Sequence, residues 1–556
     1  MRDALRFALA TALCLGCSDP APTPPADAAV ADTSASVDTP SNNDTGGPST
    51  EEAITVTAPS GALEGRVDSE GVARFLGVPY AAPPVGALRW RAPAPAAPVT
   101  GVRMALRKGA ACPQAPGMLR GNAPISEDCL SLNVWAPASA VRGAGRLPVM
   151  VFIHGGGFTA GSVWGPEYDG QRLAARGVVL VNFNYRLGQL GFLAHPRFAD
   201  ETGAQGVSGN YGTLDQQAAL RWVRDNIAQL GGDPNNVTLF GESAGSISVC
   251  SQMVSPLARG LFHRAISQSA PCSFLITPMR DADAVAPVES AEALARRFAA
   301  AAGCGDAGDV AACLRALPME RVLSTLPVNN EIVRYSARYQ PNVDGVVLRE
   351  LPWQSFLMGR IAPVPFLSGT NRDEGTAFTF SAPVNTEAAY REAVAALVPG
   401  HETEVVSTLY PVAQYGSPNA AWTAFLADAV FVCPARAQAR LVAAAGQPSY
   451  LYHFTRVNRA GTSLGLGVFH TAELPYVFGN FTGLFSRGEA DGPVVEATQG
   501  YWVRFARTGD PNGEGATRWP PLTATGDDYL DIGDTVRAAA GLHAQRCDAI
   551  ARWITP

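Results

Sequence analysis

Residues 241–245 read Gly-Glu-Ser-Ala-Gly and could make Ser243 a nucleophile. They follow the apolar run 236–240 (NVTLF) and precede a segment with helical character. A G-x-S-x-G motif between a strand and a helix holds its serine in a strained turn, with the hydroxyl clear of the sheet. Small residues at 241 and 245 let strand and helix approach each other. The motif therefore predicts that the Ser243 hydroxyl attacks a carbonyl carbon.

Residues 154–158 read His-Gly-Gly-Gly-Phe and precede this serine in the chain. Glycines leave the backbone N–H groups unobstructed and tolerate positive φ. Loops of the HGGG type supply the donors that bind an oxyanion in lipases and esterases. The predicted donors are the amides of Gly156, Gly157 and Ala244, which would stabilise charge developing on a carbonyl oxygen.

The base that takes the proton of Ser243 should come last in the chain, after an acid. His470 is the best candidate because it lies in a presumed loop between a glycine-containing stretch and Pro475. The other four histidines after Ser243 fit less well: His263 precedes any candidate acid, His401 lies among glutamates, His453 lies inside an apparent strand, and His543 lies near the chain end.

The acid should follow a late strand, and residues 364–369 provide one that leads into Thr-Asn-Arg-Asp-Glu-Gly. Asp373 and Glu374 are both candidates on this local evidence. Asp344 precedes the strand, in Val-Asp-Gly, and is interpreted as a turn residue.

Alternating strands and helices should position these residues. The expected strands are 147–154, 177–186, 236–240, 263–269, 364–369 and 449–456, with a helix over 213–230. Continuous apolar strands separated by helices indicate a mostly parallel sheet with helices on both faces. No linker or repeat divides the body, so residues 53–556 are predicted to form a single large α/β domain.

The charge of the chain is concentrated in one short segment. Residues 18–52 hold seven acidic residues and no basic one, whereas the whole chain has a formal net charge of -7. The body is nearly neutral and lacks the clustered basic residues that a nucleic-acid partner would require. No run of 18 apolar residues appears, so no membrane-spanning helix is expected.

The first 52 residues are predicted to lie outside the catalytic body. Arg2 and Arg6 precede an apolar run that ends in Gly16-Cys17, as in a secretory signal peptide covering residues 1–16. Leu15-Gly16-Cys17 resembles the end of a bacterial lipobox, which would make Cys17 a lipidation site. Residues 17–52, rich in Ala, Pro and Asp, are predicted to be a disordered tether. The alternative is ordinary secretion with cleavage further along.

Eight further cysteines would meet oxidising conditions in an exported protein. Proximity in sequence suggests the pairs Cys304–Cys313 and Cys112–Cys129, but sequence alone does not settle the pairing. Free buried thiols are the alternative interpretation.

The body resembles the type-B carboxylesterase/cholinesterase family from about residue 54 to 550. The matching stretches are FLGVPYAAPPVGALRW, EDCLSLNVW, FIHGGGF, NYRLG, DQQAALRWVRDNIAQLGGDPNNVTLFGESAGS, GTNRDEGTAF, HTAELPYVFG and YWVRFARTGDPN. The resemblance implies an α/β-hydrolase fold and a serine carboxylic-ester hydrolase that needs neither metal nor organic cofactor.

The resemblance also implies roles for individual residues. It favours Glu374 over Asp373 and so implies a triad of Ser243, Glu374 and His470. It places Glu242 and Ser269 in supporting positions around that triad. It further implies the ion pairs Arg186–Asp215 and Arg89–Glu127 and the disulfides Cys112–Cys129, Cys304–Cys313 and Cys433–Cys547, and it leaves Cys250 and Cys272 unassigned.

Departures from the family pattern bear on the substrate. Cholinesterases hold a quaternary ammonium by cation–π attraction to a tryptophan, and residues 113–128 contain none. Ala377 also replaces an aromatic residue, although Phe378 is kept. Small to medium carboxylic esters are therefore expected rather than choline esters.

Two alternatives remain at this point. One is a catalytically silent binding domain; the other is the same triad acting on amide, carbamate or thioester bonds. The expected partners are a small-molecule ester and, through Cys17 alone, a membrane. No pattern in the sequence predicts an oligomeric state.

Overall fold

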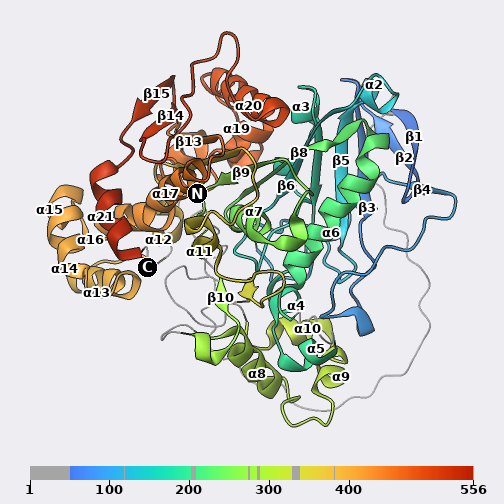
Figure 1. Cartoon of the computed structure of the whole chain (residues 1–556), viewed down its shortest axis with the longest axis horizontal. Coiled ribbons are helices and arrows are strands. Elements are labelled where there is room, and N and C mark those ends of the chain that lie inside the picture. Colours follow the sequence, from blue (N-terminus) through green and yellow to red (C-terminus); the bar gives the residue numbers. More distant parts are fainter. Residues whose placement is uncertain are drawn as a thin grey trace.

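A large central sheet organises the protein (Figure 1). The structure is a computed structural model that describes residues 51–117, 119–201, 208–272, 276–284, 289–327, 339–380 and 382–554. Within these residues the sheet has 13 strands, in the order β1-β2-β3-β5-β7-β6-β8-β9-β12-β13-β14-β15, with β4 paired to β2. Their bounds are β1 Glu52–Ala58, β2 Gly61–Val67, β3 Val72–Pro79, β4 Val102–Met104, β5 Ser131–Pro137, β6 Leu147–Ile153, β7 Val179–Phe183, β8 Gly232–Glu242, β9 Arg264–Gln268, β12 Phe366–Asn371, β13 Ser449–Phe454, β14 Asp528–Ile532 and β15 Val536–Ala540.

The strands that carry the predicted site are parallel. From β7 through β6, β8, β9, β12 and β13 to β14, each strand runs parallel to its neighbour. The path β1-β2-β3-β5-β7 and the final β14-β15 pair are antiparallel. The predicted mostly parallel sheet is therefore confirmed, with antiparallel strands at both edges. Parallel strands end at one edge of a sheet, and the loops after them can gather side chains there.

The parallel centre of the sheet is buried on both faces, as the continuous apolar strands predicted. In β6, Val149, Val151 and Ile153 face a hydrophobic cluster that includes residues of α6 (Tyr211–Asn226) and α7 (Ala244–Val254). Met150 and Phe152 face a second cluster that includes residues of α19 (Leu474–Phe478) and α20 (Asp491–Thr508). The strand period of two thus sends alternate residues into two separate cores.

The helices surround this sheet (Figure 1). Those that matter most for the site are α6 Tyr211–Asn226, α7 Ala244–Val254, α12 Thr376–Thr379, α17 Cys433–Ala444, α19 Leu474–Phe478 and α20 Asp491–Thr508. The other helices are α2 Ala138–Val141, α3 Gln171–Ala174, α4 Gly188–Phe192, α5 Pro196–Glu201, α8 Ala291–Ala301, α9 Val310–Arg315, α10 Met319–Ser324, α11 Pro352–Leu357, α13 Glu387–Leu397, α14 Glu402–Glu404, α15 Val412–Tyr415, α16 Pro418–Leu426, α18 Arg459–Leu464 and α21 Ala544–Ile554. A two-stranded sheet of β10 Thr277–Pro278 and β11 Asn342–Val343 lies apart from the main one.

The helical stretch 418–444 runs through α16, a π-helical segment Ala427–Val432 and α17. By length and composition it could cross a membrane, but 78% of its most apolar window is buried inside the protein. It packs with α13 and α21 in a third hydrophobic cluster. Its apolar character is thus accounted for by burial within the fold.

Four disulfides brace the described residues: Cys112–Cys129, Cys250–Cys272, Cys304–Cys313 and Cys433–Cys547. Three of them were implied by the resemblance, and Cys250–Cys272 joins the two cysteines that it left unassigned. The implied ion pairs Arg186–Asp215 and Arg89–Glu127 are also present. Asp344 is a turn residue, because its Oδ1 accepts the amides of residues 346–348.

The predicted signal peptide, Cys17 and nearly all of the tether lie outside the described residues. At the tether's end, Glu51 pairs with Arg74 and Glu52 begins β1. The structured body thus includes the last two residues of the predicted tether.

Candidate active site

Ser243 lies at the turn between β8 and α7, as its motif predicted. Its backbone has φ 57° and ψ −124°, a conformation that costs a non-glycine residue on the order of 1–3 kcal/mol. The neighbouring glycines make the turn possible, because a Cβ on Gly245 would lie 2.0 Å from the carbonyl oxygen of Ile153. The turn at Ser243 thus brings the start of α7 close to the end of β6, where there is no space for a side chain at position 245.

The glycine loop after β6 lies directly against this serine. A Cβ on Gly155 would be 2.9 Å from the Cβ of Ser243. Gly156 and Gly157 have φ of 108° and 62°, and the carbonyl of Gly156 accepts the amides of Thr159 and Ala160 at 3.1 and 3.0 Å. The loop thus turns back on itself beside the nucleophile.

The three predicted oxyanion donors are not engaged by any residue that the structure describes. Among the described residues, no acceptor is hydrogen-bonded to the amide of Gly156, Gly157 or Ala244. Ala244 is the first residue of α7, where helix amides have no intrahelical partner. The helix start also favours negative charge through its dipole. These amides are therefore available to an anionic oxygen.

Glu374 and His470 lie side by side at the same edge of the sheet. His470 Nδ1 is 2.6 Å from Glu374 Oε2, and Glu374 Oε1 accepts the amide of Asn371 at 2.7 Å. Glu374 is fully buried and follows β12, and His470 lies in the loop before α19. Since Oε2 can only accept, the proton of the neutral ring sits on Nδ1, which leaves Nε2 as the basic nitrogen.

Asp373 faces a different direction from Glu374. Its Oδ2 accepts the amide of Val468 at 2.7 Å and pairs with Arg372. Of the two candidates that local sequence left open, Glu374 is the one whose carboxyl group contacts His470.

The other candidate histidines have other partners. The Nδ1 of His263 accepts the amide of Val237, and His543 pairs with Asp428. His401 stacks on Trp553, and His453 is buried in β13.

The hydrogen bond between Ser243 and His470 is not formed in this structure. Among the described residues, none is hydrogen-bonded to Nε2 of His470, which lies 3.2 Å from Oε1 of Glu242. Catalytic hydrogen bonds are often long or misaligned without substrate and tighten when it binds. Glu242, expected as a buried acid at the centre, is 1% exposed and takes up this position beside the ring.

The charges around His470 change its basicity. Burial alone would lower the pKa of the ring, but the nearby Glu242 and Glu374 carboxyl groups outweigh it and raise the pKa to about 9. A carboxylate that contacts Nδ1 favours the cationic ring, the form that exists after the ring has taken a proton from the serine.

Glu473 is a buried acid that the sequence analysis missed, although it lies three residues after His470. Its Oε1 accepts the side-chain amide of Gln268 at 3.1 Å, and its Oε2 accepts that of Asn371 at 2.6 Å. Gln268 in turn accepts the indole N–H of Trp502. Burial, reinforced by Glu374, raises the pKa of Glu473 to about 6. This network ties the loop of His470 to β9 and β12.

Two phenylalanines flank the His470 ring. The rings of Phe378 and Phe431 lie 5.0 and 5.2 Å from it, and the two stack on each other at 5.5 Å. Phe378, in α12, was noted in the sequence. Phe431 was not, because it reaches the site from the π-helical segment 427–432.

Ser269, expected to support the acid, follows β9 with φ 55° and is fully buried. Its Oγ has no hydrogen-bond partner among the described residues. Its supporting role stays a prediction.

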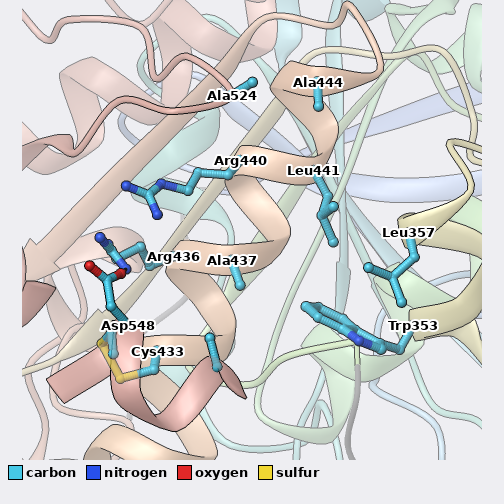
Figure 2. Close-up of a pocket in the computed structure, with 12 residues that line it drawn as sticks. Trp353, Leu357, Cys433, Arg436, Ala437, Arg440, Leu441, Ala444, Ala524 and Asp548 are labelled. Atoms are coloured by element: carbon cyan, nitrogen blue, oxygen red, sulfur yellow. A yellow bond between two sulfur atoms is a disulfide. The ribbon is translucent and has the colours of Figure 1, made fainter. Parts of the chain in front are cut away.

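A separate cavity lies between α11 and α17 (Figure 2). It has a volume of about 220 Å³. Trp353, Leu357 and Leu441 form an apolar wall, and Arg436 and Arg440 lie on its polar side. None of the candidate active-site residues lines this cavity.

Comparisons with known proteins identify the family of the chain. The sequence model of the Carboxylesterase family matches residues 52–550. The fumonisin B1 esterase of Sphingopyxis macrogoltabida is 37% identical over 494 residues, covering 87% of each chain. The para-nitrobenzyl esterase of Bacillus subtilis (strain 168) is 35% identical, over 84% of this chain and 92% of the relative. The liver carboxylesterase of Sus scrofa is 34% identical, over 88% and 90%.

A solved structure shows the same architecture. It is that of a PNB esterase, which superposes with a TM-score of 0.75 at 32% identity and covers 89% of this chain and 99% of its own. The protein has the α/β-hydrolase fold and is an enzyme that hydrolyses carboxylic esters. From residue 52 to residue 550, the chain belongs to the carboxylesterase family.

Proposed function

We propose that the protein hydrolyses esters through an acyl-enzyme on Ser243. His470 takes the proton of Ser243 while the serine oxygen attacks the ester carbonyl, and Glu374 orients the ring and stabilises its cation. The amides of Gly156, Gly157 and Ala244 hold the oxyanion. The alcohol leaves with the proton from His470, and a water activated by the same ring then releases the acid.

One observation carries this proposal. Glu374 and His470 form a 2.6 Å contact at the end of the parallel strands where Ser243 occupies a strained turn facing the glycine loop. Strained backbone conformations cluster at active sites, ligand clamps and switch regions. The residues that we propose as nucleophile, base and acid thus gather at one edge of the sheet, and this supports the proposal.

The test is the turnover of a p-nitrophenyl ester by Ser243→Ala. Turnover should fall to background while circular dichroism and thermal unfolding stay as in the wild type. Ser251→Ala is a matched control, because Ser251 lies further along α7 and, within the described part of the chain, its hydroxyl donates only to the backbone carbonyl of Ile247. Turnover retained by Ser243→Ala would overturn the assignment.

The substrates that we propose are small to medium carboxylic esters. Phe378 and Phe431 give the site an aromatic wall beside His470. Residues 113–128 contain no tryptophan to hold a quaternary ammonium, which argues against choline esters. A panel of acyl and alcohol groups, with p-nitrobenzyl esters, fumonisin B1 and acylcholines among them, would rank the preferences. A clear preference for acylcholines would contradict the proposal.

We also propose that the enzyme is exported and anchored through lipid on Cys17. Four disulfides are consistent with an oxidising compartment, and residues 1–17 have the pattern of a lipoprotein signal. Mass spectrometry of the mature protein should find a lipidated Cys17 as its first residue. An unmodified start beyond Cys17 would show that the acidic segment is a tail and not a tether.

A further inference from the structure

The side chain of His154 has no role in the mechanism above, yet it lies at the root of the glycine loop. It follows β6 directly and is 1% exposed. Its Nδ1 lies 2.8 Å from the carbonyl oxygen of Gly155, the next residue. Because a carbonyl can only accept, Nδ1 carries the proton. Burial lowers the pKa of His154 to about 4, so the ring is neutral at working pH.

This hydrogen bond determines which way one peptide unit faces. The carbonyl of Gly155 and the N–H of Gly156 belong to the same trans peptide and point in opposite directions. A donor that holds the carbonyl on one side therefore holds the N–H on the other. That N–H has no hydrogen-bond acceptor among the described residues.

We propose that His154 is a positioning residue that holds the Gly155–Gly156 peptide with the Gly156 amide turned into the oxyanion hole. The inference rests on the oxyanion role proposed for Gly156. If this peptide rotated, the carbonyl oxygen of Gly155 would face the developing negative charge and the amide would be lost to it. Glycines permit such a rotation readily, so the loop needs a group that opposes it.

The surroundings of His154 are built to keep its ring in place. The ring stacks on Tyr185, with centroids 4.5 Å apart, and the Tyr185 hydroxyl donates to the backbone carbonyl of His154 at 3.1 Å. One residue thus fixes both the ring and the main chain of His154.

The carbonyl side of the peptide is also closed by neighbouring backbone. Gly161 packs so closely against this hydrogen bond that a side chain there would not fit: a Cβ on Gly161 would lie 2.5 Å from the oxygen of Gly155 and 2.6 Å from Nδ1 of His154. Gln114 holds Gly161 there, since its side chain accepts the Gly161 amide and donates to the Gly161 carbonyl, both at 2.8 Å. The hydrogen bond therefore sits in a fitted, buried space.

The experiment compares His154→Phe with His154→Asn. Phenylalanine keeps a ring for Tyr185 and removes the donor, whereas asparagine can place an amide N–H near the position of Nδ1. His195→Phe is the matched control: His195 is also buried, and its Nδ1 also bonds a local backbone group, the amide of Arg197. The readouts are kcat and KM for a p-nitrophenyl ester, and inhibition by a trifluoromethyl ketone, which forms an oxyanion on the serine.

Complete loss of one oxyanion donor typically lowers kcat about 100- to 1,000-fold. A donor that is only mispositioned should cost less, so we expect His154→Phe to lower kcat roughly 10- to 100-fold with little change in KM. Affinity for the trifluoromethyl ketone should fall by a similar factor, His154→Asn should recover part of both, and His195→Phe should resemble the wild type.

Two results would overturn the inference. One is a wild-type kcat in His154→Phe, and the other is a loss of activity with unchanged affinity for the trifluoromethyl ketone. Failure of the proposed function would look different, because Ser243→Ala would then retain turnover. If His154→Phe fails to fold, its lowered thermal transition will show this. In that case the kcat and the trifluoromethyl ketone affinity of His154→Asn decide whether the inference holds.

Discussion

The exchange of Glu374 for glutamine should disable the enzyme without changing its shape. Glu374 Oε1 accepts the backbone amide of Asn371, and Oε2 contacts His470 Nδ1. The amide of Asn371 is fixed in the main chain and needs an oxygen opposite it. A glutamine at 374 would therefore place its oxygen there and turn its NH₂ group toward His470.

That orientation forces the wrong tautomer on the histidine. Nδ1 would have to accept from the new NH₂ group, so the ring proton would move to Nε2, which could no longer take the proton of Ser243. The equivalent acid-to-amide change in a Ser-His-Asp triad lowers kcat about 10,000-fold. We expect a similar loss here, which corresponds to about 5 kcal/mol of transition-state stabilisation.

The assay is kcat and KM for p-nitrophenyl acetate, with an NMR titration of His470. Glu374→Gln should lose kcat at nearly constant KM, and the pKa of His470 should fall, since the Glu374 carboxyl group is one of the groups that raise it. Asp373→Asn is the matched neighbour and should keep most activity, because Asp373 contacts Val468 and Arg372 and not His470. A loss below tenfold in Glu374→Gln, or an equal loss in Asp373→Asn, would refute the reasoning.

Three further predictions follow from the buried charges and the disulfides. First, kcat/KM should rise with pH with a midpoint well above 6.5, because His470 is a base only when neutral and its pKa is raised to about 9. Glu473→Gln should move this rise to lower pH, since Glu473 also raises the pKa of His470. An unmoved pH profile in Glu473→Gln would contradict the assignment. Second, burial lowers the pKa of His453 to about 4, so near pH 5 this histidine binds a proton only in the unfolded chain, and the fold loses stability as the pH falls from about 6.5 to 4. His453→Phe should lessen this loss of unfolding free energy by about 3 kcal/mol, measured by urea unfolding at several pH values. An unchanged dependence of the unfolding free energy on pH would refute this. Third, removing the disulfide Cys433–Cys547, whose cysteines are 114 residues apart, should lower the free energy of unfolding by about 5 kcal/mol, because the reduced chain gains more conformational entropy when a longer loop is opened. Removing Cys304–Cys313, whose cysteines are 9 residues apart, should lower it by about 3 kcal/mol. Equal losses in the two double-alanine variants would show that loop length does not set the effect.

The sequence predicted the parallel core of the fold well, because fully buried strands appear as continuous apolar runs. Strands β6, β7, β9 and β13 lie within the expected ranges, and β12 overlaps its expected range 364–369 but ends two residues later, at Asn371. Strand β8 begins earlier than expected, at Gly232, because pairing with Leu147 of β6 extends it through polar residues that carry no apolar signal. Strands β1, β2 and β3 of the antiparallel edge, and β4, which pairs parallel to β2, have partly or fully exposed faces and were not predicted as strands at all.

The candidate site was predictable where a motif fixes the backbone and unpredictable where tertiary contacts decide. G-x-S-x-G and HGGG require a particular local geometry, and both have it. Asp373 and Glu374 are adjacent in a loop, and only packing shows which one meets the histidine. Glu473, Phe431 and the Cys250–Cys272 pair depend on neighbours distant in the chain, which no local pattern reveals.

The most direct test of the central claim is covalent labelling of the nucleophile. The intact enzyme is treated with a fluorophosphonate, digested, and mapped by mass spectrometry. The mechanism predicts one phosphonyl adduct per chain, on Ser243 in the peptide that contains Gly241 and Gly245, and complete loss of ester hydrolysis in step with its formation. An adduct on another serine, or inactivation without an adduct on Ser243, would contradict it.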